Sequence, residues 1–169
     1  ALYQARPIVL FEKFNVDETR GTLRASGDAS FEVAKLRFRS PNLKVSGDLS
    51  GRPLRGGKSK VTIKTAVDAR VADGRFSFAG ATLELRNLVT QGIKGNVTLK
   101  GSLAGNTKTK LWTVKGGKVT TKLTGKTLPK GKLAARLDAN VVVNLAEQKI
   151  DVETFSVRAL DVKVLGRVK

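Results

Sequence analysis

The stretch LAARLDANVVVNL, residues 133–145, alternates apolar and polar side chains over thirteen positions. Leu133, Leu137 and Val141 fall on one side of an extended chain, whereas Arg136 and Asp138 fall on the other. Because successive side chains of a β-strand point to opposite faces of a sheet, the pattern predicts a half-buried strand with one wet face. Thirteen residues at roughly 3.3 Å each would span about 43 Å, well beyond the usual length of a strand.

Similar alternation predicts strands elsewhere in the chain. Residues 61–71 place Val61, Ile63 and Val67 on one face, and shorter alternating runs occur between residues 76 and 164. No segment of ten or more residues carries the apolar stripe of an amphipathic helix. We therefore predict an all-β chain with an elongated, curved, mostly antiparallel sheet built from repeated strand pairs, in which residues 1–169 form a single elongated domain.

Interruptions that contain glycine predict the hairpin loops, because glycine supplies the positive φ that such turns require. These interruptions lie at residues 72–74, 104–106, 115–118 and 129–131. The longest polar interruption covers residues 50–58. It predicts either a flexible loop or a boundary between two parts of one sheet.

The composition excludes several classes of protein. Lys and Arg number 32 against 14 Asp and Glu, which gives a formal charge of +18, and 40% of the 169 residues are hydrophobic. Cys is absent, so disulfides give no information about the redox compartment. The first residues lack the apolar segment of a signal peptide, and no window approaches the roughly 20 apolar residues of a membrane-spanning helix. Since no Met begins the chain, we expect it to be a processed piece of a longer protein.

The sequence offers little for catalysis. Without His or Cys there is no imidazole base, no thiolate nucleophile and no zinc site built from those ligands. Asp17 and Glu18 are adjacent, but neighbours in a strand point to opposite faces and do not converge on one substrate. The segment GRPLRGGKS, residues 51–59, resembles a phosphate-binding loop but has one residue too many and precedes a strand. We expect no enzyme activity, no cofactor and no metal.

One phrase occurs more than once in the chain. LRFRSPNLKVSGDL, residues 36–49, aligns without a gap to FSVRALDVKVLGRV, residues 155–168, and a looser copy occupies residues 83–97. We interpret each copy as a strand, a short break at Asn or Asp, and a second strand that enters a glycine. Repeated units stack because one unit cannot bury its apolar face alone, so a repeat architecture is predicted, with chance resemblance as the alternative.

The last forty residues resemble a known family. KLAARLDANVVVNLAEQKIDVETFSVRALDVKVLGRVK, residues 132–169, contains a long strand, a short turn, a second strand at 149–157 and a closing L-x-V-x-V-x-G phrase at 160–166. This order is similar to the repeats of the AsmA-like proteins of bacterial envelopes, and RGTLRASGD, residues 20–28, resembles them too. The resemblance implies a periplasmic segment of a protein anchored in the inner membrane. It also implies a groove-shaped sheet that carries phospholipids towards the outer membrane, without catalytic residues.

The positive charge has two further interpretations. Basic proteins bind nucleic acids through phosphate contacts. Here Lys and Arg are spread over nearly every segment, one Trp and one Tyr are available for base stacking, and no nucleic-acid-binding motif occurs. Contact with the anionic head groups of a membrane surface uses the same charge and agrees better with the family resemblance. Nucleic acid is therefore the less favoured partner.

The candidate site is the apolar side of the sheet. If the sheet curls, the apolar side chains would form a trough for acyl chains, with Lys and Arg at the strand ends around its rim. The step from Val152 to Phe155 changes parity, so a β-bulge is needed there to keep both residues on this side. The candidate lipid contacts are Val61, Ile63, Val67, Phe76, Phe78, Leu83, Leu85, Leu133, Leu137, Val141, Val143, Ile150, Val152, Phe155 and Val157.

Two functions remain open on the sequence alone. The first is non-catalytic binding or transfer of a phospholipid or other anionic lipid between the inner and outer membranes. The second is a structural or protein-interaction repeat whose exposed edge strands pair with a second copy or with envelope proteins. The structural alternative to the trough is an ordinary sealed core between two sheets.

Overall fold

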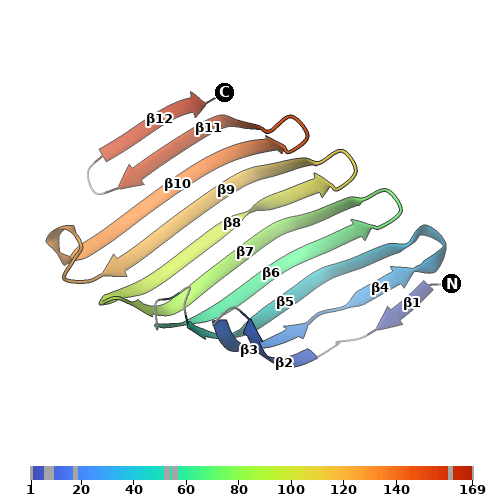
Figure 1. The fold of residues 1–169 in the computed structure, drawn as a ribbon, viewed down its shortest axis with the longest axis horizontal. Helices are drawn as coiled ribbons and strands as arrows, with labels where there is room; N and C mark the ends of the chain where they lie inside the picture. Colours follow the sequence, from blue (N-terminus) through green and yellow to red (C-terminus); the bar gives the residue numbers. More distant parts are fainter. Residues whose placement is uncertain are drawn as a thin grey trace.

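The computed structural model describes residues 2–5, 10–16, 19–51, 54, 57–159 and 162–168, which form one antiparallel sheet (Figure 1). Its strands are β1 (Leu2–Ala5), β2 (Leu10–Val16), β3 (Thr19–Ser26), β4 (Ala29–Glu32), β5 (Arg37–Gly51), β6 (Lys58–Arg70), β7 (Arg75–Thr90), β8 (Ile93–Asn106), β9 (Leu111–Thr124), β10 (Lys132–Asn144), β11 (Lys149–Ala159) and β12 (Val162–Val168). Two short 3₁₀ turns, η1 (Val33–Lys35) and η3 (Pro129–Gly131), connect β4 to β5 and β9 to β10.

The sheet is open and follows the order of the chain. From β5 to β12 each strand pairs with the next one in sequence. The strands β3 and β4 both pair with β5, and they pair in turn with β2 and β1. In the described residues β12 pairs only with β11, so the sheet does not close into a barrel. The curved, antiparallel, all-β fold predicted from the sequence is confirmed (Figure 1).

The sheet is a single layer. Its accessible surface is 11626 Å² for a mass of 18.1 kDa, whereas a compact protein of this mass exposes about 8,100 Å². Among the side chains that the structure describes, Val61 and Leu88 are the only large hydrophobic ones that are buried, at 5% and 9% exposure. All strands of this part of the chain belong to one sheet, so it contains no sealed core between two sheets.

Alternate strands carry an extra residue at the same level of the sheet. The strands β5, β7, β9 and β11 have β-bulges at residues 41–42, 79–80, 115–116 and 153–154. The strands between them continue regularly past this level. A bulge bends its strand and increases the local twist, so four bulges in one row bend the sheet along a line across the strands. We call this row the bulge line. The bulge predicted between Val152 and Phe155 is confirmed as its last member.

The bulges recur with a regular period along the chain. The residues that follow them are Leu43, Ala81, Gly117 and Phe155, at intervals of 38, 36 and 38 residues. Each repeat contains one bulged strand and one regular strand. A period of this length is typical of stacked supersecondary units, each of which needs its neighbours to complete the fold.

Four equivalent turns join the repeats along one edge of the sheet, which we call the turn edge. The last residues of these turns, which all adopt positive φ, are Leu36, Gly74, Lys110 and Gln148. Successive turns are hydrogen-bonded: the N–H groups of Val71, Thr107 and Leu145 donate to the carbonyls of Leu36 (3.0 Å), Gly74 (2.8 Å) and Lys110 (3.0 Å). The repeats are therefore tied together by their turns as well as by their strands.

The repeated phrase of the sequence does not mark these structural repeats. Residues 36–49 lie almost wholly in β5, whereas residues 155–168 run from β11 into β12 and residues 83–97 run from β7 into β8. A repeat architecture is correct, but the alignment that defined it was wrong. Alternating β sequences can be aligned with each other at several different offsets. The bulges determine the correct offset, and they are not visible in such an alignment.

The predicted loops were partly correct. Residues 72–74 and 129–131 do lie in connections between strands. Residues 104–106 instead end β8, and the turn follows at residues 107–110. Residues 115–118 lie inside β9, where Gly116 has φ 60 and forms the bulge, so the loop predicted there was wrong. The polar segment 50–58 connects β5 to β6, which pair directly as far as Ser50 and Lys58, so the sheet continues across it.

Candidate functional site

The strand register brings all fifteen candidate residues to one face of the sheet, which we call the apolar face. Residues directly opposite each other in paired strands project to the same side. The pairs on β6 and β7 include Val61 with Leu85, Ile63 with Leu83, and Val67 with Phe78. The pairs on β10 and β11 include Leu137 with Val157, Val141 with Val152, and Val143 with Ile150. The candidates therefore form two groups on this face, separated by β8 and β9.

The apolar face extends well beyond the residues predicted from the sequence. Its further members on β5, β8 and β9 include Phe38, Leu43, Val45, Val97, Leu99, Leu103, Trp112, Val114, Val119 and Leu123. In the described parts of β5 to β12, no strand position that registers on this face is charged. These residues were missed because glycines such as Gly95, Gly101 and Gly105 interrupt the alternation of β8. A search of the sequence for segments in which every second residue is uncharged would have identified these residues.

The apolar face is exposed rather than covered. Leu99 and Leu137, near its centre, are 36% and 37% exposed. The most buried residues of the described chain (Ser40, Ser59, Val61, Thr65 and Leu88) all belong to this face, as expected where side chains converge on the inside of a curve. Eight strands at about 4.8 Å spacing give the face an area on the order of 1,000 Å². Exposed apolar patches on soluble monomers are typically about 300–600 Å², and larger ones mark interaction sites.

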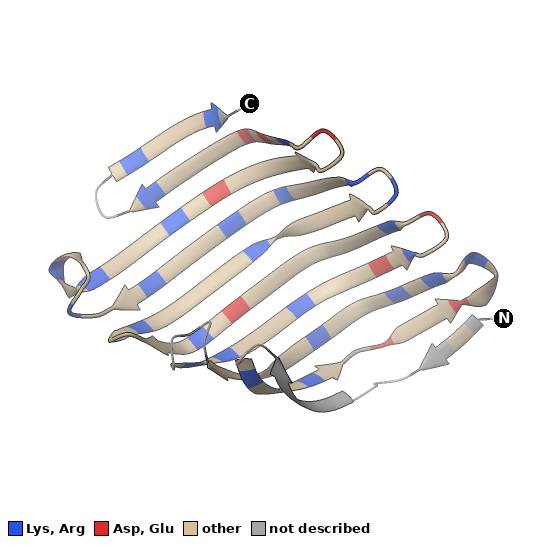
Figure 2. Cartoon of the chain, in the orientation of Figure 1, with Lys and Arg blue, Asp and Glu red and all other residues tan. Residues whose placement is uncertain are grey.

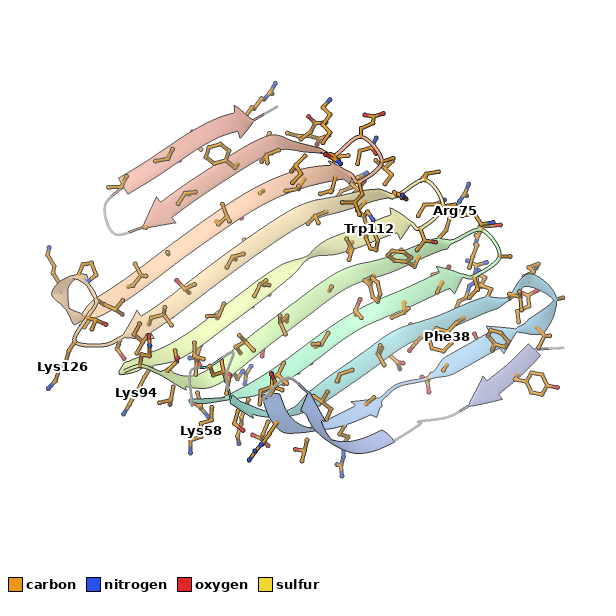
Figure 3. The ribbon with its side chains drawn as sticks, in the orientation of Figure 1. Phe38, Lys58, Arg75, Lys94, Trp112 and Lys126 are labelled. Carbon is orange, nitrogen blue, oxygen red and sulfur yellow. The ribbon has the colours of Figure 1, made fainter. Side chains whose placement is uncertain are left out.

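Aromatic rings occupy the part of the apolar face next to the turn edge. Phe76 and Trp112 lie 4.6 Å apart between ring centroids, and Phe76 and Phe78 lie 6.0 Å apart. Gly105, on the strand between Phe76 and Trp112, gives the two rings room to meet, since a Cβ there would lie 2.8 Å from each ring. Figure 3 shows Phe38 and Trp112 at this end of the sheet. This half of the face is thus filled by its own side chains.

Polar side chains hold the bulges in place from the opposite face. The N–H of Gly116 donates to Oδ1 of Asn140 (2.7 Å), and the N–H of Gly80 donates to Oγ of Ser102 (3.1 Å). At the first bulge, Nδ2 of Asn42 donates to the carboxylate of Asp28 (2.8 Å). The bonds at Gly116 and Gly80 satisfy backbone donors that the bulges remove from the strand ladder, whereas the bond at Asn42 joins two side chains. The bend of the apolar face is therefore fixed by specific side chains.

The other face, which we call the polar face, is strongly basic. Lys44 lies opposite Lys64, Lys100 opposite Lys118, and Arg136 opposite Arg158. Such like-charge pairs destabilise a sheet, so they are not explained by folding alone. Basic side chains were predicted at the strand ends around a trough, but Figure 2 shows them along the whole length of the strands as well. Basic residues therefore occur at the strand ends, as predicted, and also along the strands, in agreement with their spread over nearly every segment of the sequence.

Five of the described carboxylates (Glu32, Asp68, Glu84, Asp138 and Asp151) form ion pairs. Nε of Arg37 donates to Asp68 at 2.8 Å, and Arg39 lies 3.5 Å from the same carboxylate. The hydrogen bond from Arg37 lowers the pKa of Asp68 below its usual value, and the bond from Arg136 lowers the pKa of Asp138 in the same way. These exposed pairs neutralise few of the basic groups. Between Glu84 and Asp138 the chain has twelve Lys and Arg but no Asp or Glu.

The described residues show no arrangement typical of an enzyme. Hollows on the polar face, including one of about 400 Å³ near Asp68, Arg70 and Arg75, are shallow and hold no pair of converging acids. No group of three potential metal ligands occurs in the described chain, and none of its helices could span a membrane. The adjacent acids Asp17 and Glu18 lie outside the described residues.

No known family model, curated protein or solved structure matches this chain.

Proposed function

We propose that the apolar face binds the acyl chains of a phospholipid or other anionic lipid, without catalysis. The observation that carries this proposal is an uncharged face across eight strands that no second layer covers in the described chain. A partner that covers this face must itself be apolar, because no strand position on the face offers a charge for recognition. Acyl chains meet this requirement and gain roughly 0.8 kcal/mol for each buried methylene group.

The shape of the sheet supports a lipid rather than a flat partner. The bulge line bends the strands, so the apolar face becomes a trough with its axis across them. Ala81, Gly101, Gly117 and Ala139 lie side by side along this line on four neighbouring strands. Their small side chains leave the lowest part of the trough open. The repeat allows such a trough to be lengthened by adding further strand pairs.

The cellular setting follows from the resemblance to AsmA-like proteins and remains part of the proposal. In that setting the chain is a periplasmic segment of a protein anchored in the inner membrane. It would shield acyl chains from water between the inner and outer membranes. A membrane surface is a natural contact for the basic polar face, since anionic head groups attract Lys and Arg.

A photoreactive phospholipid tests the proposed function. The purified chain is incubated with vesicles that contain phosphatidylglycerol with a photoreactive group at the end of one acyl chain, re-isolated, irradiated and digested. We expect stoichiometric labelling at apolar-face residues such as Leu99, Val119 and Leu137. Absence of bound lipid, or labelling mainly at the polar-face residues Thr98, Thr120 and Arg136, would contradict the proposal.

The open end of the sheet favours a second candidate function, pairing with another protein. The outer edge of β12 has no partner strand in the described chain, and its apolar residues Val162 and Val164 are 63% and 48% exposed. Exposed edges of this kind add strands from other chains. If edge pairing is the main function, the chain associates end to end at high concentration and yields no stoichiometric lipid on organic extraction.

A further inference from the structure

We infer that the edge of the sheet opposite the turn edge binds the phosphate of a phospholipid, and that this end of the trough receives the head group. This inference rests on the proposed function, which concerns only the acyl chains. The edge is defined by five exposed lysines: Lys58, Lys94, Lys126, Lys130 and Lys132. We call it the lysine edge.

Three of these lysines are placed by the repeat itself. Lys58, Lys94 and Lys132 begin or nearly begin the regular strands β6, β8 and β10, at intervals of 36 and 38 residues. They share one row at the end of the strands, with Val89 and Thr124 between them, and the register places this row on the polar face. Because strands are about 4.8 Å apart, neighbouring lysines of this row are about 9.6 Å apart. Figure 3 shows Lys58, Lys94 and Lys126 pointing away from the sheet beyond the strand ends.

No carboxylate neutralises the lysine edge in the described chain. The ion pairs of this part of the molecule involve none of the five lysines. The nearest acids along the chain are Asp48, Asp68, Glu84 and Asp138, of which Asp68 pairs with Arg37 and Glu84 pairs with Arg86 (2.6 Å). The turn edge differs, since its turns contain Asp73 and Glu147. The two rims of the trough therefore have different charge, and only the lysine edge is uniformly cationic.

The apolar face also differs on the two sides of the bulge line. Towards the turn edge, Phe76, Phe78 and Trp112 fill the surface with aromatic rings. Towards the lysine edge the face is aliphatic, as at the paired residues Val61 and Leu85. The half of the trough next to the lysines is thus lined by aliphatic rather than aromatic side chains.

This aliphatic half of the trough is long enough for an acyl chain. From Lys94 to Gly101, β8 advances seven residues, or about 23 Å. The hydrocarbon layer of one membrane leaflet is about 15 Å thick. A phospholipid with its phosphate at the lysine edge can therefore lay an extended acyl chain along the strands and end near the bulge line. The opposite orientation would place the chain on the aromatic rings and the phosphate near Asp73.

Two triple variants with the same change in charge test this assignment. The edge variant carries Lys58→Gln, Lys94→Gln and Lys126→Gln. The control variant carries Lys44→Gln, Lys64→Gln and Lys100→Gln, which removes three exposed lysines from the polar face between the two edges. Binding of fluorescent phosphatidylglycerol and phosphatidylcholine with identical acyl chains is measured for wild type and both variants, and circular dichroism checks their folding.

We expect wild type and the control variant to bind phosphatidylglycerol more tightly than phosphatidylcholine. In the edge variant this preference should fall about tenfold, because three cations near the head group are removed. Phosphatidylcholine binding should remain equal in all three proteins. An equal loss in both variants would overturn the inference, since it would show general attraction by net charge. Competition by soluble glycerol phosphate alone would also overturn it, because the edge would then bind a free anion. If wild type binds neither lipid, the proposed function itself fails.

Discussion

A glycine controls the aromatic cluster at the turn edge. Gly105 lies between Phe76 and Trp112, whose centroids are 4.6 Å apart. We predict that Gly105→Ala destabilises the protein by about 1–2 kcal/mol, because its Cβ would lie 2.8 Å from both rings and push them apart. Trp112 is the only Trp, so its fluorescence reports this change directly. Ala104→Val, one residue away on the polar face, is the control and should leave the emission unchanged. Unaltered emission in Gly105→Ala would contradict the packing.

A single carboxylate should give the stability a measurable pH dependence. Arg37 lowers the pKa of Asp68 in the folded protein, so the unfolded state binds more protons in acid. The contribution of Asp68 to the free energy of unfolding is therefore complete above the ordinary Asp pKa of about 3.9. It is lost as the pH falls through the lowered pKa that Asp68 has in the folded protein. Because the pair is partly exposed, Asp68→Asn should cost at most about 1 kcal/mol at pH 6. Urea unfolding should show the difference from wild type shrinking below about pH 4. A constant difference down to pH 2.5 would contradict this account.

At the scale of the strand, the bulges decide which side chains reach the apolar face. Gly116 has φ 60 with open space where a Cβ would lie, so a substitution there tests backbone conformation alone. We predict that Gly116→Ala lowers the free energy of unfolding by about 1–2 kcal/mol, whereas Gly116→Asn costs less, since Asn tolerates this conformation better. Thermal unfolding of both variants provides the comparison. Equal and negligible effects would mean that the strand is regular at this point.

The same bulges explain what the sequence could and could not predict. The regular strands β6 and β10 were predicted with nearly correct bounds, because their alternation runs without a change of parity. The bulged strand β7 was seen as two separate runs, at Phe76–Phe78 and Leu83–Leu85, because the bulge at residues 79–80 shifts the pattern by one. Gly116 and Gly117 suggested a turn for the same reason, since glycine is common to turns and bulges.

The candidate site was predictable to a similar extent. All fifteen predicted residues share one face, because each was chosen from a run with clear alternation. The strands β8 and β9, which join the two groups, were not included, since Gly and Thr replace large apolar residues there. The lysine edge was also missed. Lys58, Lys94 and Lys132 become neighbours only through strand pairing, which no local pattern specifies.

At the scale of the whole molecule, the central claim is that the apolar face is an open trough for acyl chains. Val141 lies on this face in β10, opposite Val114 and Val152. A carboxylate at this site can reach water if the trough is open, whereas an unpaired charge in a sealed core costs several kcal/mol and is enough to unfold an ordinary domain. The matched control is Thr120→Glu, which places the same carboxylate on the polar face opposite Arg136.

The most direct measurement is phosphatidylglycerol binding by Val141→Glu and Thr120→Glu, with circular dichroism to confirm folding. The account predicts that both variants fold, that Thr120→Glu binds within about threefold of wild type, and that Val141→Glu binds at least about tenfold more weakly. Failure of Val141→Glu to fold would show that the face is a sealed core. A folded Val141→Glu that binds as tightly as Thr120→Glu would show that acyl chains do not lie on this face.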